Sequence, residues 1–379
     1  MNYYGQLIRR ERLRRNWSQA GLCSGICAVS YLSKIEQGLA APSNEVLQLL
    51  LARLELTPDV MALLDAKALA EDGFELLFSG NFEALRAAFC GFDAKRFRAA
   101  PEYLSLRLLL ALAEGSGTPL ERELEACMDT RELALQRILQ GRDAEAIALL
   151  PNAYAHYCLG LAEYESGRYT ASLEALQTAY DLAARDGAAH LMLECRALMG
   201  SCYCNQKNLP SMQAHYAVAR RLAKALDKQD TLRAIDYNTA AVQIETGDYE
   251  SAYAYFSARQ NPDVMALHKL AICCEKTGRK EEALAALDRA DAMQSGYPAP
   301  ELAKKLCDLV RWRLAHEDYL SDAVYGELLL TCFERCRKEL PAGYASFHLP
   351  WVLEWYRATR QYKKAYQLLS GFPDQKDET

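Results

Sequence analysis

The sequence predicts an all-α protein, and three observations support that class. Alanine, leucine and glutamate are abundant in the 379 residues while β-branched residues are sparse, a composition that favours helices. Apolar residues recur at helical spacing, as Leu22 and Ile26 do. A small residue followed by a turn recurs from positions 160, 200 and 240, a period of forty residues. The length exceeds one compact core, so we expect two or more domains or a repeat array.

The N-terminal 65 residues predict five short helices. Ser18 and Ser43 are suitable N-caps for the second and fourth, because a serine hydroxyl can accept a bond from an unpaired backbone N–H. Gly38 suits the left-handed residue that ends the third. We expect these helices at about 3–16, 18–25, 28–37, from Ser43 onward, and from Thr57-Pro58 to about Asp65.

The second and third of these helices carry a recognisable motif. Its residues are Ser18-Gln19, Gly25-Ile26-Cys27 and the string from Ser30 to Gly38, S-Y-L-S-K-I-E-Q-G. This pattern resembles the Xre-type, lambda-repressor-like helix-turn-helix over about residues 3–65. More narrowly, it resembles the N-terminal domain of the Rgg and PlcR (RRNPP) group of peptide-sensing quorum regulators of Gram-positive bacteria. The resemblance implies that the third helix enters the major groove of DNA.

Residues of the two motif helices are the expected DNA contacts. Lys34 can donate to guanine, the serines can bond either type of base edge, and Val29 can pack on a thymine methyl. Gln19 can donate to a phosphate or brace the third helix. The predicted contacts are Gln19, Val29, Ser30, Tyr31, Ser33, Lys34 and Gln37. We expect Arg9 and Glu36 to form a structural charge pair between the first and third helices.

Charge is distributed unevenly between the two ends of the chain. Residues 1–34 hold six cations and one carboxylate, a net charge of +5, although the whole chain carries −6. A basic end on an acidic protein fits a module that binds nucleic acid, and a merely solvated helix face is the alternative. A single head of this size binds weakly, so we expect a homodimer on a palindromic operator of double-stranded DNA.

The rest of the chain, residues 66–373, predicts a right-handed solenoid of tetratricopeptide repeats. The clearest copies start at Gly160, Gly200 and Ala240, with turns at 167–169, 207–209 and 247–249. Weaker copies have turns at 80–82, 141–143, 278–280 and 360–362, and residues 374–379 form a charged tail. A generic α-solenoid is the alternative. We expect small residues where paired helices approach closely.

The family resemblance implies asparagines in the solenoid groove that bind the backbone of a short signalling peptide. Asn238 and Asn205 are at suitable positions, although Cys158 and Leu198 stand where further asparagines would be expected. An asparagine amide can both donate to and accept from an extended peptide. The other predicted lining residues are Tyr237, Ser201, Ile244, Glu245, Tyr164 and Lys269. Asn238 could instead bond a neighbouring helix within the solenoid.

Other function classes find little support. The sequence contains no phosphate loop, no Gly-x-Ser-x-Gly and no HExxH motif, so we expect no enzyme activity and no cofactor. The thirteen cysteines lack paired zinc spacing, and we expect reduced, buried thiols rather than a metal site or a redox sensor. No signal peptide or membrane span is apparent, which predicts a cytoplasmic protein.

The predicted function is a cytoplasmic transcriptional regulator whose solenoid senses a signalling peptide and thereby alters promoter binding by a dimer. The alternative is a helix-turn-helix regulator whose repeats dock another protein.

Overall fold

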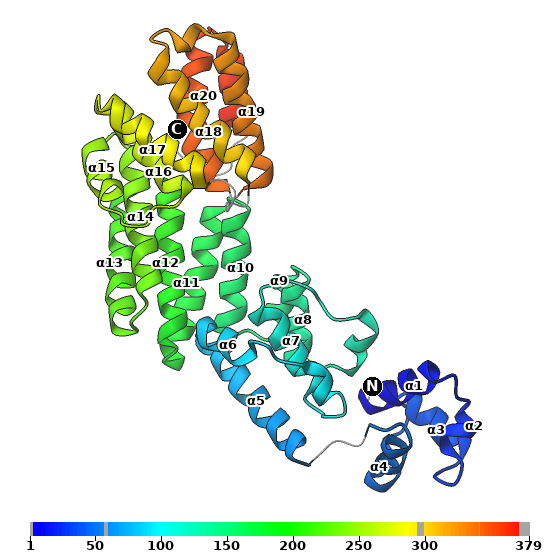
Figure 1. Ribbon diagram of the computed structural model, residues 1–379. Coiled ribbons are helices and arrows are strands. Elements are labelled where there is room, and N and C mark those ends of the chain that lie inside the picture. Colours follow the sequence, from blue (N-terminus) through cyan, green and yellow to red (C-terminus); the bar gives the residue numbers. More distant parts are fainter. Residues whose placement is uncertain (1–2, 57–59, 294–298, 341, 371–379) are drawn as a thin grey trace. The chain divides into compact units, whose positions relative to one another are not determined.

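The computed structural model describes residues 3–56, 60–293, 299–340 and 342–370, and these form helices and no strands (Figure 1). The predicted all-α class is confirmed. The chain divides into two compact units, residues 1–159 with 177–192 and residues 160–176 with 193–379.

The first unit begins with a small helical head. Its helices are α1 (Tyr3–Arg14), α2 (Gln19–Cys23), α3 (Val29–Glu36) and α4 (Asn44–Arg53). The Ser18 hydroxyl accepts a bond from the Gly21 N–H at 3.0 Å, and the Ser43 hydroxyl accepts one from the Val46 N–H at 3.3 Å. Both predicted N-caps are therefore confirmed. Gly38 follows α3 with φ of +74°, the left-handed conformation expected at a helix end.

Leucine and isoleucine side chains from all four helices form the core of the head. The fully buried members, each 5% exposed or less, are Leu7, Ile8, Leu22, Leu32, Ile35, Leu50, Leu51 and Leu54. Burial of one apolar side chain contributes about 1.5–3 kcal/mol, so this cluster is the main source of the head's stability.

Helix α5 (Val60–Ser79) follows the head and runs without interruption through Asp65. The expected end of the fifth helix near Asp65 is therefore wrong: no glycine or proline stands in α5 before Gly73, and the turn comes at Gly80, with φ of +79°. Met61 and Leu64 are each 59% exposed. Thr57 and Pro58 lie outside the described residues, and the boundary between the two predicted domains at 65/66 stays a prediction.

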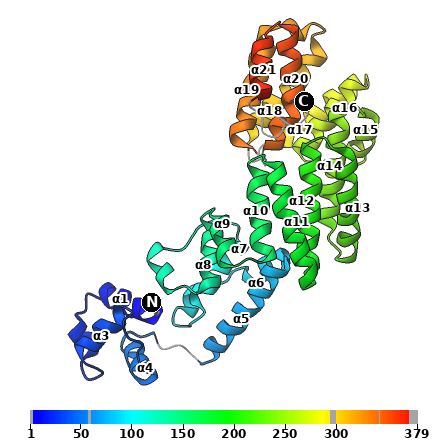
Figure 2. The same ribbon diagram turned by 180° about the vertical axis from the view of Figure 1, so that it is seen from behind.

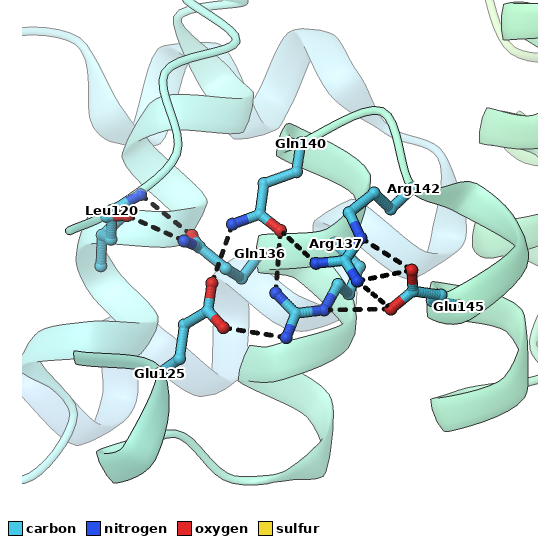
Figure 3. Close-up of polar contacts among 7 residues, drawn as sticks. All are labelled: Leu120, Glu125, Gln136, Arg137, Gln140, Arg142 and Glu145. Atoms are coloured by element: carbon cyan, nitrogen blue, oxygen red, sulfur yellow. Dashed lines mark hydrogen bonds and ion pairs between the residues drawn. The ribbon is translucent and has the colours of Figure 1, made fainter. Parts of the chain in front are cut away.

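Short helices follow α5 in the first unit. They are α6 (Phe82–Phe89), η1 (Ala94–Phe97), α7 (Tyr103–Ala113), η2 (Arg122–Cys127), α8 (Thr130–Leu139) and α9 (Asp143–Leu149). Polar side chains hold the irregular segment around η2 against α8 and α9 (Figure 3). Gln136 exchanges two hydrogen bonds with the backbone of Leu120, and Arg137 joins Glu125 at 2.9 Å to Glu145 at 3.6 Å.

Helical hairpins make up the rest of the chain, and Figure 2 shows their paired helices from the side opposite to Figure 1. The three strongest predicted turns each separate two helices of one hairpin. The pairs are α10 (Ala153–Glu165) with α11 (Tyr169–Asp186), α12 (Ala189–Asn205) with α13 (Leu209–Ala225), α14 (Gln229–Glu245) with α15 (Tyr249–Ser257), α16 (Val264–Lys276) with α17 (Lys280–Met293), α18 (Pro300–Ala315) with α19 (Ala323–Glu339), and α20 (Ala342–Ala358) with α21 (Tyr362–Ser370). The weaker turn signals at 80–82, 141–143, 278–280 and 360–362 also fall between helices. The charged tail at 374–379 lies outside the described residues.

Small residues lie where the helices of a hairpin approach closely, as expected. A Cβ on Gly160 would lie 2.7 Å from Leu176 Cγ, and one on Gly200 would overlap the Tyr216 ring. The Ser172 hydroxyl also donates to the Gly160 carbonyl at 2.6 Å. These contacts require glycine because any side chain at either position would push the two helices apart.

Candidate functional site

Helix α3 presents one apolar face to the core of the head and one mixed face to solvent. Leu32, Ile35 and Glu36 are buried, whereas Val29, Ser30 and Lys34 are exposed. The exposed set combines a cation, a hydroxyl and an apolar group, which are the types of side chain that contact base edges in the major groove. Phosphate contacts alone would carry no sequence information.

The other predicted DNA contacts bond within the head. Gln19 donates to Glu36 Oε2 at 2.9 Å and so braces α3, the second of the two roles considered for it. The Tyr31 hydroxyl donates to the Ala41 carbonyl at 3.0 Å. Gln37 donates to the Ser33 hydroxyl at 3.0 Å. The DNA-contacting role of all these residues stays a prediction.

The charge pair between α1 and α3 is formed by Arg12 and Glu36, and not by Arg9. The Arg12 guanidinium donates to both carboxylate oxygens of Glu36, at 2.6 and 2.7 Å, and to the Trp17 carbonyl at 2.8 Å. Arg12 and Glu36 are 8% and 2% exposed, and the hydrogen bond from Arg12 to Glu36 raises the pKa of the guanidinium. The prediction of Arg9 is wrong because Arg9 lies on the exposed side of α1.

The second unit contains a cavity of about 160 Å³ that gathers most of the predicted ligand-binding residues. Seven of the eight line it, from four successive hairpins: Tyr164, Ser201, Asn205, Tyr237, Asn238, Glu245 and Lys269. Ile244 does not line it, and its assignment is wrong. Its side chain is 2% exposed and packs in a core cluster with Ala240 and Phe256.

Both asparagines in the cavity use their amide nitrogens within the protein. Asn205 donates to the Tyr164 hydroxyl at 3.3 Å and to the Ser201 carbonyl at 3.0 Å. Asn238 donates to the Tyr216 hydroxyl at 3.2 Å and to the Ser201 hydroxyl at 3.5 Å. The amide nitrogen of Asn238 therefore bonds neighbouring helices within the solenoid, which was the alternative role for this residue. Neither Oδ1 atom accepts a hydrogen bond from another described residue, so both oxygens are left to accept from a ligand.

One wall of the cavity comes from α20, which the sequence did not indicate. Gly343, Tyr344 and Phe347 lie on its first turns and line the cavity. A Cβ on Gly343 would lie 2.7 Å from Asn205 Oδ1, so the backbone of α20 approaches the Asn205 side chain closely. No spacing pattern links positions so far apart in the chain, and only the packing of the last hairpin brings them together.

Burial shifts the pKa values of the two charged groups that line the cavity, Glu245 and Lys269. Burial raises the pKa of Glu245, against the ion pair that its carboxylate makes with the Lys207 ammonium at 3.5 Å. Burial lowers the pKa of Lys269 on the neighbouring repeat. Lys269 is 6% exposed and the Glu245 side chain is 11% exposed, so the charged groups of the cavity are poorly solvated and would interact strongly with polar ligand groups.

A larger cavity of about 350 Å³ lies in the first unit and is lined by residues of α1 and η2. Two of its arginines, Arg9 and Arg10, are exposed, and the third, Arg98, is half-buried and pairs with Glu11 at 3.1 Å. None of the predicted ligand-binding residues lies there. Buried polar groups converge in the smaller cavity, which makes it the candidate ligand site.

Metal and membrane sites are not found in the part of the chain that the structure describes. No three His, Cys, Asp or Glu side chains there are grouped as metal ligands. No described helix combines the length and the apolar character needed to cross a bilayer. The thirteen cysteines are free thiols; eight are buried, and Cys90 is exposed.

A comparison with protein families decides the class of the head. The family described as Helix-turn-helix matches residues 8–61, a range that includes α2, α3 and α4. The head is a helix-turn-helix domain. This confirms the resemblance to the Xre-type module, a DNA-binding domain of transcription regulators. A search of curated proteins finds no match.

Two solved structures are similar to this helix-turn-helix protein. The first is a Rap protein complexed with Competence and Sporulation Factor, with a TM-score of 0.58 at 15% identity over 81% of this chain and 97% of that chain. The second is PlcR of Bacillus thuringiensis in complex with the peptide PapR7 and DNA, with a TM-score of 0.33 at 17% identity over 62% of this chain and 99% of that chain. The likeness to the Rap protein shows a shared helical-repeat fold.

Proposed function

We propose that this protein is a transcriptional regulator that binds a palindromic operator as a homodimer and responds to a short peptide in the cavity of its second unit. The observation that carries the proposal is the combination of a helix-turn-helix head with a cavity lined by two asparagines. The peptides named in the two similar structures are consistent with this class of ligand.

For DNA, the exposed face of α3 supplies the chemistry of base recognition. Lys34 would donate to guanine O6 or N7, Ser30 would bond a neighbouring base edge, and Val29 would contact a thymine methyl. Arg12 and Glu36, buried behind this face, fix α3 to α1 and so hold the reading residues in one orientation.

For the ligand, the free Oδ1 atoms of Asn205 and Asn238 would accept hydrogen bonds from backbone N–H groups of an extended chain. Tyr164 and Tyr237 offer apolar faces for side chains. The volume of about 160 Å³ is below the 300 Å³ or more that is usual for ligand sites. We therefore expect the first turns of α20, which lie against Asn205, to move away when a peptide binds.

This movement supplies the coupling between ligand and operator. A ligand that binds the opened arrangement shifts the population of the second unit toward it, by as much as its affinities for the two arrangements differ. The changed arrangement of the hairpins then alters how two heads in a dimer reach paired half-sites.

The test is genome-wide immunoprecipitation of the protein with and without spent culture medium. We expect defined promoter sites with two-fold symmetry whose occupancy changes with medium. The variant Lys34→Ala with Ser30→Ala should lose these sites and keep its helical content, whereas Lys67→Ala, which removes the same charge from the exposed side of α5, should keep them.

Unchanged occupancy in the Lys34→Ala, Ser30→Ala variant would show that α3 does not read DNA. Occupancy that never responds to medium or to short peptides would favour the alternative, in which the repeats dock another protein.

A further inference from the structure

Lys269 is a buried cation without a partner anion, and it faces the ligand cavity. The side chain is 6% exposed, and it lines the cavity beside Asn238 and Glu245. Its ammonium makes no hydrogen bond or ion pair with any residue in the described part of the chain. A buried charge is costly unless it is paired, so its retention here calls for a compensating group.

Two aromatic rings provide only part of that compensation. Lys269 Nζ lies 5.1 Å from the centroid of the Tyr237 ring and 4.7 Å from that of Phe347. Such cation–π contacts recover less free energy than the burial of a charge costs. The rings also fix where the ammonium can point, because they flank it from α14 and α20.

The carboxylate among the residues that line the cavity is already engaged. Glu245 pairs with Lys207 at 3.5 Å, and Lys207 is not one of the residues that line the cavity. Glu245 is thus shared between two ammonium groups. Asp263, whose charge also raises the pKa of Lys269, is exposed and caps α16 by accepting from the Ala266 N–H at 2.7 Å. Burial holds the pKa of Lys269 below its usual value, and an incoming anion would oppose that shift.

We infer that Lys269 binds a carboxylate of the ligand, so that the cavity selects a peptide with an anionic group at this position. The inference rests on the proposed peptide function and narrows its ligand class. The carboxylate can be the C-terminus of the peptide or an Asp or Glu side chain, two sources of the same chemistry. The free Oδ1 of Asn238, which lines the same cavity, would accept from an adjacent N–H.

The first experiment needs no knowledge of the peptide. The probes are N-acetyl-L-leucine, an anion at neutral pH, and N-acetyl-L-leucinamide, its neutral counterpart. Binding to the full chain is measured by ligand-observed NMR at millimolar concentrations. We expect the anion to bind at least about tenfold more tightly than the amide, a difference of about 1.4 kcal/mol.

Two matched variants assign this preference to Lys269. Lys269→Met keeps the length and apolar contacts of the side chain and should abolish the preference for the anion. Lys276→Met removes an exposed lysine from the same helix and should leave it unchanged. Equal binding of anion and amide to the unaltered chain, or an anion preference that survives in Lys269→Met, would overturn the inference. The comparison in the unaltered chain holds even if a variant fails to fold.

The second experiment distinguishes a C-terminal carboxylate from an Asp or Glu side chain. It also tests the anion site separately from the proposed peptide function. Pools of random hexapeptides are made with free C-termini, with amidated C-termini, and without Asp and Glu. The thermal stabilisation of the full chain by each pool is then measured. Loss of the thermal stabilisation on amidation identifies the terminal carboxylate, and loss on omission of Asp and Glu identifies a side chain. Stabilisation by all pools alike would contradict the inference. If N-acetyl-L-leucine binds and no pool does, the anion site stands and the peptide function fails.

Discussion

Replacing Glu36 by alanine tests how the head holds its reading helix. Glu36 accepts both hydrogen bonds from the Arg12 guanidinium and one from Gln19, at 2.6–2.9 Å. Glu36→Ala removes all three and leaves the guanidinium of Arg12, 8% exposed, with only the Trp17 carbonyl at 2.8 Å. We therefore expect a large loss of stability in the head.

The magnitude follows from burial. Removing one partner of a buried ion pair costs about 3–5 kcal/mol, because the other charge stays buried without compensation. A small domain has about 0.05–0.15 kcal/mol of stability per residue, which gives about 3–8 kcal/mol for a head of this length. The substitution should therefore unfold a large fraction of the heads.

Amide hydrogen exchange measured by mass spectrometry is the suitable assay, because it reports α1 to α4 separately from the hairpins. Glu36→Ala should speed exchange in these four helices and leave α14 to α19 unchanged. Arg9→Ala, on the exposed side of α1, should change stability by less than about 0.5 kcal/mol. The double variant Arg12→Met with Glu36→Leu should recover much of the loss, since it removes both buried charges.

Normal exchange in Glu36→Ala, or a larger effect from Arg9→Ala, would refute this account and would favour the pairing predicted from sequence.

Three further predictions concern the hairpins. Gly200→Ala should cost about 1–3 kcal/mol, because the new Cβ meets the Tyr216 ring; an unchanged urea midpoint would contradict this. Burial lowers the pKa of His348 from 6.5 to about 4, so the folded state binds fewer protons than the unfolded state between these values. Stability should therefore fall on acidification from pH 7 to 5, by up to about 1.4 kcal/mol per pH unit from this residue, and His348→Gln should flatten the profile in urea unfolding. Asn238→Ala should reduce thermal stabilisation by peptide pools without changing operator affinity, and an unaltered stabilisation would remove Asn238 from the site.

Local signals made the helices and hairpins predictable. Ser18 and Ser43 cap helices as expected, and the turn signals at 167–169 and 247–249 begin with glycines that adopt positive φ. At the equivalent turn Lys207 takes φ of +58°, a conformation that costs more for a side chain but still breaks the helix. Such features depend only on neighbouring residues, and so the sequence carries them.

Features that depend on packing were harder to predict from the sequence. Arg9 and Arg12 are three residues apart on α1, so helical spacing alone could not decide which of them meets Glu36. Ile244 lies next to Glu245, and only the packing of α14 decides which side chain enters the core. The contribution of α20 to the cavity could not be predicted, because Gly343 and Asn205 are in contact although several hairpins separate them in the sequence.

The contact between Gly343 and Asn205 also has a kinetic consequence. If the occupied site requires α20 to separate from Asn205, the ligand can enter only during the fraction of time for which the two are apart. The observed affinity is then the intrinsic affinity reduced by that fraction, and the observed association rate levels off at the opening rate as ligand concentration rises. A side chain in place of Gly343 that is too large for rotation of Asn205 to accommodate would hold the two segments apart. It should therefore speed capture of the ligand and at the same time lower the concentration at which the protein responds.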